Sequence, residues 1–211
     1  MTPKKINYQH TADTIIKNLE KRQMKGYYCE TKEDAVKLAL SLMPVGSSIS
    51  WGGSMTLSEC GLMDAVKSAD YDIIDRDTAK TPEEIREMGG KICTSDFFLM
   101  STNAITMDGE LVNVDGRANR VAFLCYGPQN VIIIAGMNKV TLDADEGLKR
   151  ARNIAAPPNT VRLARNTPCS VTGKCGDCLS PDCICSQIVI TRRSHIPDRI
   201  KVILVGEELG Y

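Results

Sequence analysis

The sequence lacks any long run of apolar residues. Its most apolar stretch, residues 131–137, is already interrupted by Gly136, whereas a membrane-spanning helix needs about 18 consecutive apolar residues. A secretory signal is missing as well, because the two lysines near the N-terminus are not followed by an apolar core. We therefore expect no membrane association and a cytoplasmic location, where thiols stay reduced.

The chain also lacks an excess of charge of either sign. Lysine plus arginine total 26, aspartate plus glutamate total 26, and the formal net charge is zero. Long-range attraction to nucleic acid or to an anionic membrane is therefore not expected, although a local basic pocket for a small anion remains compatible. Histidine is scarce: His10 and His195 stand isolated and are best interpreted as surface or structural residues, so no histidine base is predicted.

What the sequence does contain is an alternation of helical patterns with short apolar runs. This alternation is typical of βαβ units, and it predicts an α/β fold with a Rossmann-like, three-layer, mostly parallel sheet covered by helices on both faces. The dipeptide Asp108-Gly109 between two extended pieces predicts an inserted β-hairpin. The length favours one domain over residues 1–211.

Capping signals predict where helices begin and end. Thr81, followed by a proline and two glutamates, is a strong helix start. Residues 56–59 have the pattern of a capping box that would open another helix. We predict a strand at 120–126, and a helix from Asp143 that ends at the two prolines 157–158.

Nine cysteines are present, and five of them crowd into the cysteine segment, residues 169–185. The four scattered ones are expected to be small buried residues. In the crowded segment, Cys175 and Cys178 form a Cys-x-x-Cys pair, while Cys183 and Cys185 are two apart and would project to one side of an extended chain. We predict a metal site there, with free thiols or disulfides as the alternatives. Both zinc and an iron–sulfur cluster suit such thiolates, and the spacing favours neither.

A glycine-rich loop, residues 50–56, joins a predicted strand to a predicted helix. Free backbone N–H groups at such a junction suit a phosphate or carboxylate, although a plain tight turn is the alternative. The loop matches neither a P-loop nor a GxGxxG fingerprint. Polar residues near the ends of two other strands would face it along the ligand crevice of a parallel sheet. The predicted pocket for a small anionic metabolite comprises Gly52, Gly53, Ser54, Thr56, Asn103, Asn138 and Lys139.

Four motifs occur together along the chain: Trp51–Thr56, Thr102–Gly109, Val114–Arg120 and Ala135–Lys139. In this order they resemble the LUD-domain (lactate utilisation protein) family. The resemblance implies a fold similar to that of ribose-phosphate isomerases, glucosamine-phosphate deaminases and CoA transferases (NagB/RpiA/CoA transferase-like). It also implies a link to the oxidation of L-lactate to pyruvate, with iron–sulfur redox proteins as partners.

The cysteine segment resembles that of a stand-alone branch of the same family, which carries Thr-Gly-Lys-Cys-x-Asp-Cys followed by Ser-Pro-Asp-x-Ile-Cys. This resemblance implies Cys175, Cys178 and Cys185 as metal ligands. Cys169 would be the fourth ligand, and Cys183 a spare.

Three functional hypotheses follow. The first is carboxylate utilisation or associated electron transfer, with a small anion in the pocket and the metal nearby. The second is a non-catalytic metabolite sensor or regulator with a structural zinc. The third, by fold analogy alone, is a sugar-phosphate isomerase or a CoA transferase-like enzyme. No catalytic residue is assigned; Glu59, Asp108 and Asp115 are the available carboxylates, and a homo-oligomer is compatible with all three.

Overall fold

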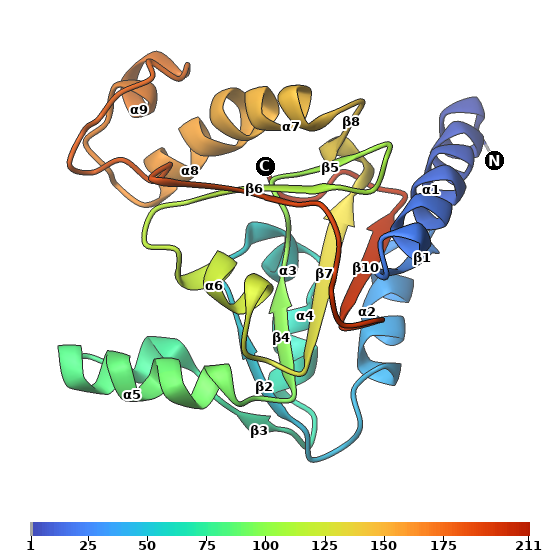
Figure 1. Cartoon of the computed structure of the whole chain (residues 1–211), viewed down its shortest axis with the longest axis horizontal. Coiled ribbons are helices and arrows are strands. Elements are labelled where there is room, and N and C mark those ends of the chain that lie inside the picture. Colours follow the sequence, from blue (N-terminus) through green and yellow to red (C-terminus); the bar gives the residue numbers. More distant parts are fainter. Residues whose placement is uncertain (1) are drawn as a thin grey trace.

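A six-stranded parallel sheet is the centre of the computed structural model, which describes residues 2–211 (Figure 1). Every neighbouring pair of its strands is parallel, so the predicted α/β fold is confirmed. In spatial order the strands are β1 (Lys25–Cys29), β10 (Ile200–Val205), β7 (Asn130–Gly136), β4 (Phe97–Met100), β2 (Ser48–Trp51) and β3 (Asp72–Ile73).

Both faces of this sheet are buried, as its apolar central strands require. Along β7, Val131 and Ile133 pack into one hydrophobic cluster while Ile132 and Ile134 pack into the other, and each such isoleucine contributes about 2 kcal/mol by burial. The first cluster is covered by α1 (Pro3–Lys21), α5 (Pro82–Cys93) and α6 (Asn119–Cys125). The second is covered by α2 (Lys32–Ser41), α3 (Met55–Glu59) and α4 (Leu62–Lys67).

The predicted hairpin forms at Asp108-Gly109, but it belongs to a separate four-stranded sheet. Its strands β5 (Ala104–Thr106) and β6 (Leu111–Asp115) pair antiparallel, and Gly109 adopts a φ of +83° in the turn. The outer strands of this sheet are β8 (Val140–Thr141) and β9 (Gln187–Thr191). The strand that follows the cysteines therefore extends this second sheet instead of the main one.

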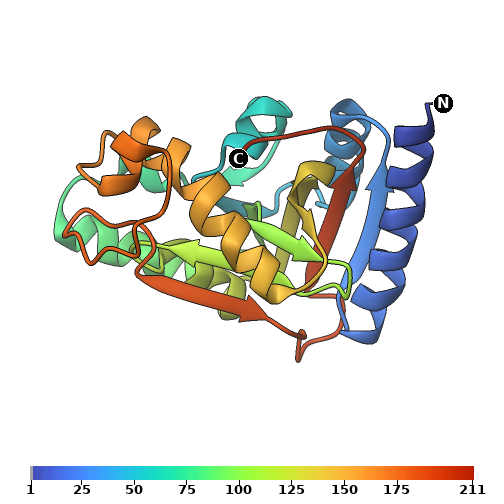
Figure 2. The same ribbon diagram turned by 90° about the horizontal axis from the view of Figure 1, so that it is seen from above.

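One nearly continuous helical segment leads toward the cysteines. It comprises α7 (Ala144–Arg150), a π-helical turn (Ala151–Ala155) and α8 (Ala156–Arg162), and a short α9 (Pro168–Thr172) follows. Figure 2 shows this segment running away from α1, from the middle of the molecule to α9 near the opposite end. Short 3-10 turns occupy Arg76–Thr78 and Met137–Lys139. No helix within residues 2–211 is long and apolar enough to cross a membrane.

The predicted strand at 120–126 is wrong, because this segment is helix α6. The Asp115 carboxylate accepts hydrogen bonds from the backbone N–H groups of Arg120 and Val121, at 3.2 and 3.3 Å, and thereby caps the helix start. Val121 and Leu124 face the core while Cys125 is exposed, which is a helical and not an alternating pattern. Asp115 lies four residues before the first residue of α6 and not at the usual N-cap position directly before it. The sequence therefore has no standard capping signal here.

Two other predicted helix ends need correction. Ser54 caps α3 by accepting from Leu57 N at 3.4 Å, so residues 56–59 do not form a capping box. Pro157 and Pro158 lie in the first turn of α8, where a missing N–H is tolerated after the π-helical turn. The start at Thr81 is confirmed as a full capping box.

Candidate functional site

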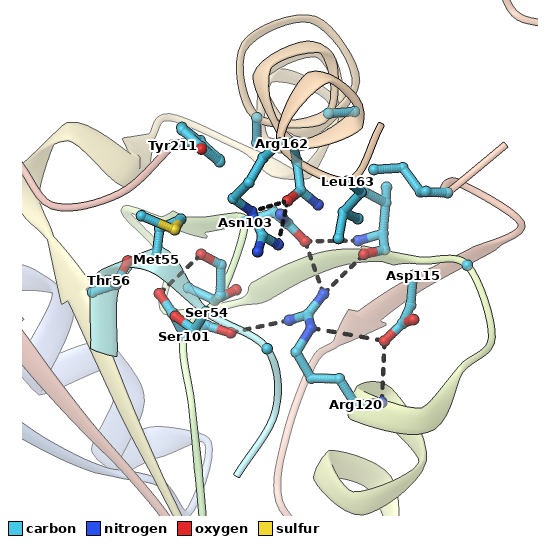
Figure 3. Close-up of a pocket in the computed structure, with 18 of the residues that line it drawn as sticks. Ser54, Met55, Thr56, Ser101, Asn103, Asp115, Arg120, Arg162, Leu163 and Tyr211 are labelled. Atoms are coloured by element: carbon cyan, nitrogen blue, oxygen red, sulfur yellow. Dashed lines mark hydrogen bonds and ion pairs between the residues drawn. The ribbon is translucent and has the colours of Figure 1, made fainter. Parts of the chain in front are cut away.

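A cavity of about 350 Å³ lies at the carboxyl ends of β2, β4 and β7. This is the edge at which open α/β sheets hold their ligands. Figure 3 shows Arg162 reaching into it from α8 on one side and Arg120 from α6 on the other. We call it the anion cavity, for the charge of its lining described below.

The structure brings together five of the seven residues predicted for the pocket. The predicted residues that line the anion cavity are Gly53, Ser54, Thr56, Asn103 and Lys139. Gly52 and Asn138 lie outside the lining. Gly52 instead lies against the side chain of Arg120, and Asn138 binds the chain next to Tyr211. Both residues thereby position other parts of the lining.

The two glycines of the loop allow arginine side chains to pass close to the backbone. A Cβ on Gly52 would lie 2.9 Å from Cγ of Arg120, and a Cβ on Gly53 would lie 3.2 Å from Nη2 of Arg76. The first distance is shorter than normal packing permits. Gly52 is therefore required for the position of Arg120.

We expect Gly52→Ala to destabilise the protein, because the added methyl group displaces Arg120 from its buried position. Overpacking of this kind costs about 1–3 kcal/mol in free energy of unfolding, measurable by urea denaturation. Gly89→Ala is the matched control: nothing lies within 4 Å of its Cβ position on α5, so this change should stabilise the helix by about 0.5–1 kcal/mol. A Gly52→Ala protein as stable as wild type would contradict this role.

Asn138 fixes the last residues of the chain. Its Oδ1 accepts from Leu209 N at 3.1 Å, and its Nδ2 donates to Gly210 O at 3.2 Å. Glu59 accepts from Gly210 N at 2.6 Å. Tyr211, held by these contacts, forms part of the cavity wall. Asn138 and Glu59 thus position one wall of the anion cavity without facing its interior.

Arg120 is the central buried cation of the site, with a side chain only 12% exposed. Its Nε lies 3.7 Å from Oδ2 of Asp115. Its two terminal nitrogens donate to Ser101 O (3.0 Å), Asn113 Oδ1 (2.5 Å), Asn103 Oδ1 (3.0 Å) and Val114 O (2.8 Å). These bonds join the strand β6 to the loop after β4. Asn103, predicted to bind the ligand, uses its Oδ1 to hold Arg120.

Lys139 is buried at the base of the cavity and is only 4% exposed. Its Nζ donates to Thr56 Oγ1 at 2.9 Å, to Ser101 Oγ at 3.2 Å and to Thr102 O at 3.3 Å. No carboxylate in residues 2–211 lies within ion-pair distance of this amine. Its partners are therefore two hydroxyl groups and one carbonyl group.

Burial lowers the pKa of Lys139 to about 7, and repulsion by Arg150 and Arg120 adds to the effect. Arg150 is itself 7% exposed, and burial lowers its pKa to about 10. Its Nε donates to Asn138 O at 2.9 Å. A large fraction of Lys139 is consequently uncharged near neutral pH, whereas Arg150 stays charged.

The lining of the anion cavity is strongly cationic, although the whole chain has no net charge. Within residues 2–211 it holds six basic side chains and one acidic side chain, Asp115. The basic residues are Lys139 and the five arginines Arg76, Arg117, Arg120, Arg162 and Arg165. Sequence reasoning missed the arginines, because they come from three separate segments that only the folded chain brings together.

A second cavity, of about 130 Å³, is lined by all five residues of the cysteine cluster: Cys169, Cys175, Cys178, Cys183 and Cys185. All five are free thiols of intermediate exposure. Ala156 and Ile184 line this cavity and the anion cavity alike. The predicted metal segment therefore lies directly beside the predicted anion pocket.

Within the cluster, Cys185 is surrounded by three of the other cysteines. Burial, followed by the proximity of Cys183, Cys175 and Cys169, raises the pKa of the Cys185 thiol to about 12. The Cys185 backbone N–H donates to Sγ of Cys183 at 3.3 Å. Throughout residues 2–211, no three or more His, Cys, Asp or Glu side chains are already arranged around one metal position.

The scattered cysteines match their prediction in part. Cys29 and Cys60 are buried, as expected of small apolar residues, and burial raises the pKa of both thiols. Cys93 is half-buried and Cys125 is exposed. The expectation was wrong for Cys125 because it lies on the outer face of α6, in the segment predicted as a strand.

Comparison with known proteins gives a family and a fold. The sequence model of the LUD domain family matches residues 12–205. A solved structure, a DUF162 family protein from Deinococcus radiodurans, superimposes with a TM-score of 0.52 and 14% sequence identity, over 95% of this chain and 98% of that one. No curated protein sequence matches the chain. The structural likeness shows a common fold across almost the full length of both chains.

Proposed function

Because this chain belongs to the LUD domain family, we propose that it serves carboxylate utilisation by binding a small anionic metabolite in the anion cavity. The best candidates are L-lactate and its oxidation product, pyruvate. The observation that carries this proposal is the charge of the lining, five arginines against one carboxylate side chain. Partly enclosed cations attract an anion more strongly than they would in bulk water.

The cations divide into an inner and an outer group. The terminal nitrogens of Arg120 already donate to the protein, so Arg120 contributes its positive field and no direct contact. Arg162 is exposed on α8 and held by Asn159 Oδ1, at 3.0 and 2.7 Å, which leaves Nη1 of its guanidinium available to a ligand. Arg76, which passes over Gly53, is a second outer cation. A guanidinium matches the geometry of a carboxylate.

A CoA transferase-like enzyme would need a reactive glutamate, and Glu59 does not suit this role. Its carboxylate accepts a hydrogen bond from the backbone N–H of Gly210 and does not line the cavity. The alternative of a metabolite sensor uses the same anion cavity. It differs from carboxylate utilisation in lacking turnover and in having a structural zinc at the cysteines.

Isothermal titration calorimetry with L-lactate and pyruvate tests the proposal. We expect saturable binding that weakens as salt is added, because ions screen the attraction. Lactamide, which has the shape of lactate without its charge, is the matched ligand control and should not bind. Equal binding of lactamide, or no binding of either carboxylate, would contradict the proposal.

Arg162→Gln should weaken carboxylate binding about 10- to 100-fold, because a charge-assisted hydrogen bond contributes about 1.5–3 kcal/mol. The same titration measures this change. Arg86→Gln removes an exposed arginine from α5, outside the cavity, and should leave the affinity unchanged. If both variants bind as wild type does, the ligand lies elsewhere.

We also propose that the cysteine cluster holds zinc or an iron–sulfur cluster, with Cys169, Cys175, Cys178 and Cys185 as ligands. A donor set composed of sulfur alone fits either group. Residues 175–186 contain no helix or strand, so the thiols can draw together around a metal. An iron–sulfur cluster would supply electron transfer, to or from iron–sulfur redox partners, whereas zinc would brace the chain between α9 and β9.

A further inference from the structure

The amine of Lys139 has surroundings that suit a nucleophile better than a permanent cation. It lies in the lining of the anion cavity and is almost fully buried, and no carboxylate of residues 2–211 forms an ion pair with it. Arg120 and Arg150 lie close enough to repel a proton from it. A lysine beside other cations in a desolvated site is a recognised form of activated amine.

The hydrogen bonds of Lys139 also match an uncharged amine, which donates two protons and offers one lone pair. Thr56 Oγ1 donates its own proton to Leu209 O at 3.3 Å, so it accepts from Lys139. Thr102 O can only accept. The Ser101 hydroxyl, 3.2 Å away, accepts from the ammonium form of Lys139; once the amine is uncharged it can turn its proton toward the lone pair, since its other acceptor lies at a longer 3.4 Å. All three contacts are then satisfied without an ammonium group.

We propose that Lys139 forms a Schiff base with a 2-oxo acid held in the anion cavity. This inference rests on the proposed anion binding, and it adds a covalent step and a substrate class. A 2-oxo acid combines the two features that the site requires, a carboxylate for the outer arginines and an adjacent carbonyl carbon for the amine. Lys139 is thereby a catalytic residue, and Ser101 and Thr56 are positioning residues.

The step is balanced without an oxidant or a reductant. The Lys139 nitrogen attacks the carbonyl carbon and forms the C=N bond, while the carbonyl oxygen leaves as water with the two amine protons. The reverse reaction adds water and restores the free amine. The buried position of Lys139 favours the imine, because water has limited access to the base of the cavity.

Trapping with borohydride tests the inference on the wild-type protein. The full chain is incubated with pyruvate and sodium borohydride, and the modified residue is located by peptide mass spectrometry. We expect one reduced pyruvate adduct, on Lys139. L-lactate has no carbonyl group to condense, so it should give no adduct and should slow trapping by competition. Lys139→Arg should abolish the adduct, and Lys149→Arg on α7 should retain it.

The rate of trapping should rise as pH increases through about 7, the pKa of Lys139. The charged groups that act on this amine are Arg150 on α7, Arg120 on α6 and Glu59 on α3. The two arginines lower the pKa and the glutamate raises it. An exposed lysine would instead become reactive only near pH 10.

The outcomes separate this inference from the proposed function. Calorimetric binding of pyruvate without an adduct on Lys139 overturns the Schiff base and leaves anion binding intact. Absence of both binding and trapping overturns both. Adducts spread over surface lysines at equal rates also overturn the Schiff base. Because the adduct is mapped on wild-type protein, poor folding of a variant does not affect the result.

Discussion

Arg120→Met is expected to destabilise the protein by about 3–5 kcal/mol, the usual result of removing one partner from a buried ion pair. The change leaves the Asp115 carboxylate, itself only 10% exposed, without its guanidinium. It also leaves Oδ1 of Asn103 (Figure 3) and Oδ1 of Asn113 without their donors. Nδ2 of Asn113 has no hydrogen-bond partner among the described residues. Rotating this amide in the variant would therefore only exchange one unpaired buried polar atom for another.

Urea denaturation of three variants measures the effect of Arg120. Arg120→Lys should recover only part of the lost free energy of unfolding, because an ammonium group cannot reproduce the four hydrogen bonds of the planar guanidinium. Arg117→Met is the control, since this neighbouring arginine is exposed and its loss should change stability by no more than about 0.5 kcal/mol. If Arg120→Met proved as stable as Arg117→Met, Arg120 would not organise the site.

Arg120 also connects stability to ligand binding. It holds Asn103 and the carbonyl of Ser101, next to the partners of Lys139. Partial unfolding of this network would therefore disturb the base of the anion cavity. We expect the Arg120→Lys protein to bind carboxylates more weakly than wild type even at temperatures where it remains folded.

Cys185→Ala is expected to abolish metal binding. Cys169, Cys175 and Cys183 all lie near enough to Cys185 to raise the pKa of its thiol. A metal site with four thiolate ligands seldom retains its metal after losing one of them. The measurement is metal and sulfide analysis, with a visible spectrum, of protein purified without oxygen. Iron with sulfide and a brown colour would identify an iron–sulfur cluster, whereas a colourless protein with one zinc would identify a structural site.

Cys125→Ala is the matched control for Cys185→Ala, because Cys125 is exposed on α6 and does not line the cavity of the cluster. It should retain all of the metal. If wild-type protein purified without oxygen contains neither iron nor zinc, the proposed metal site is wrong.

Two further variants determine whether Cys178 or Cys183 belongs to the ligand set. The resemblance to the stand-alone branch predicts that Cys178→Ala loses the metal and Cys183→Ala retains it. The structure places Cys183 against Cys185, with the Cys185 N–H pointing at the Cys183 sulfur. The opposite result, loss with Cys183→Ala alone, would put Cys183 into the ligand set in place of Cys178.

Some features of this protein depend on residues close together in the chain, and these could be predicted. The capping box at Thr81 and the turn at Asp108-Gly109 are complete within a few residues. The buried β7 shows itself by its continuous apolar run. The family motifs and the spacing of the cysteines are also local. Sequence alone was therefore sufficient for the α/β fold, the family, and two neighbouring regions of chemical interest.

The tertiary structure decided what those regions consist of. Helix α6 begins where the Asp115 carboxylate accepts hydrogen bonds from its first turn. Gly52 is needed because the side chain of Arg120 lies too close to the place that a Cβ would take. Arg76, Arg120 and Arg162 meet in one cavity although more than forty positions separate each from the next. The pKa of Lys139 falls only because folding removes water from its amine and brings two arginines near. Burial and electrostatic repulsion depend on distances in space, and distances along the chain do not determine them.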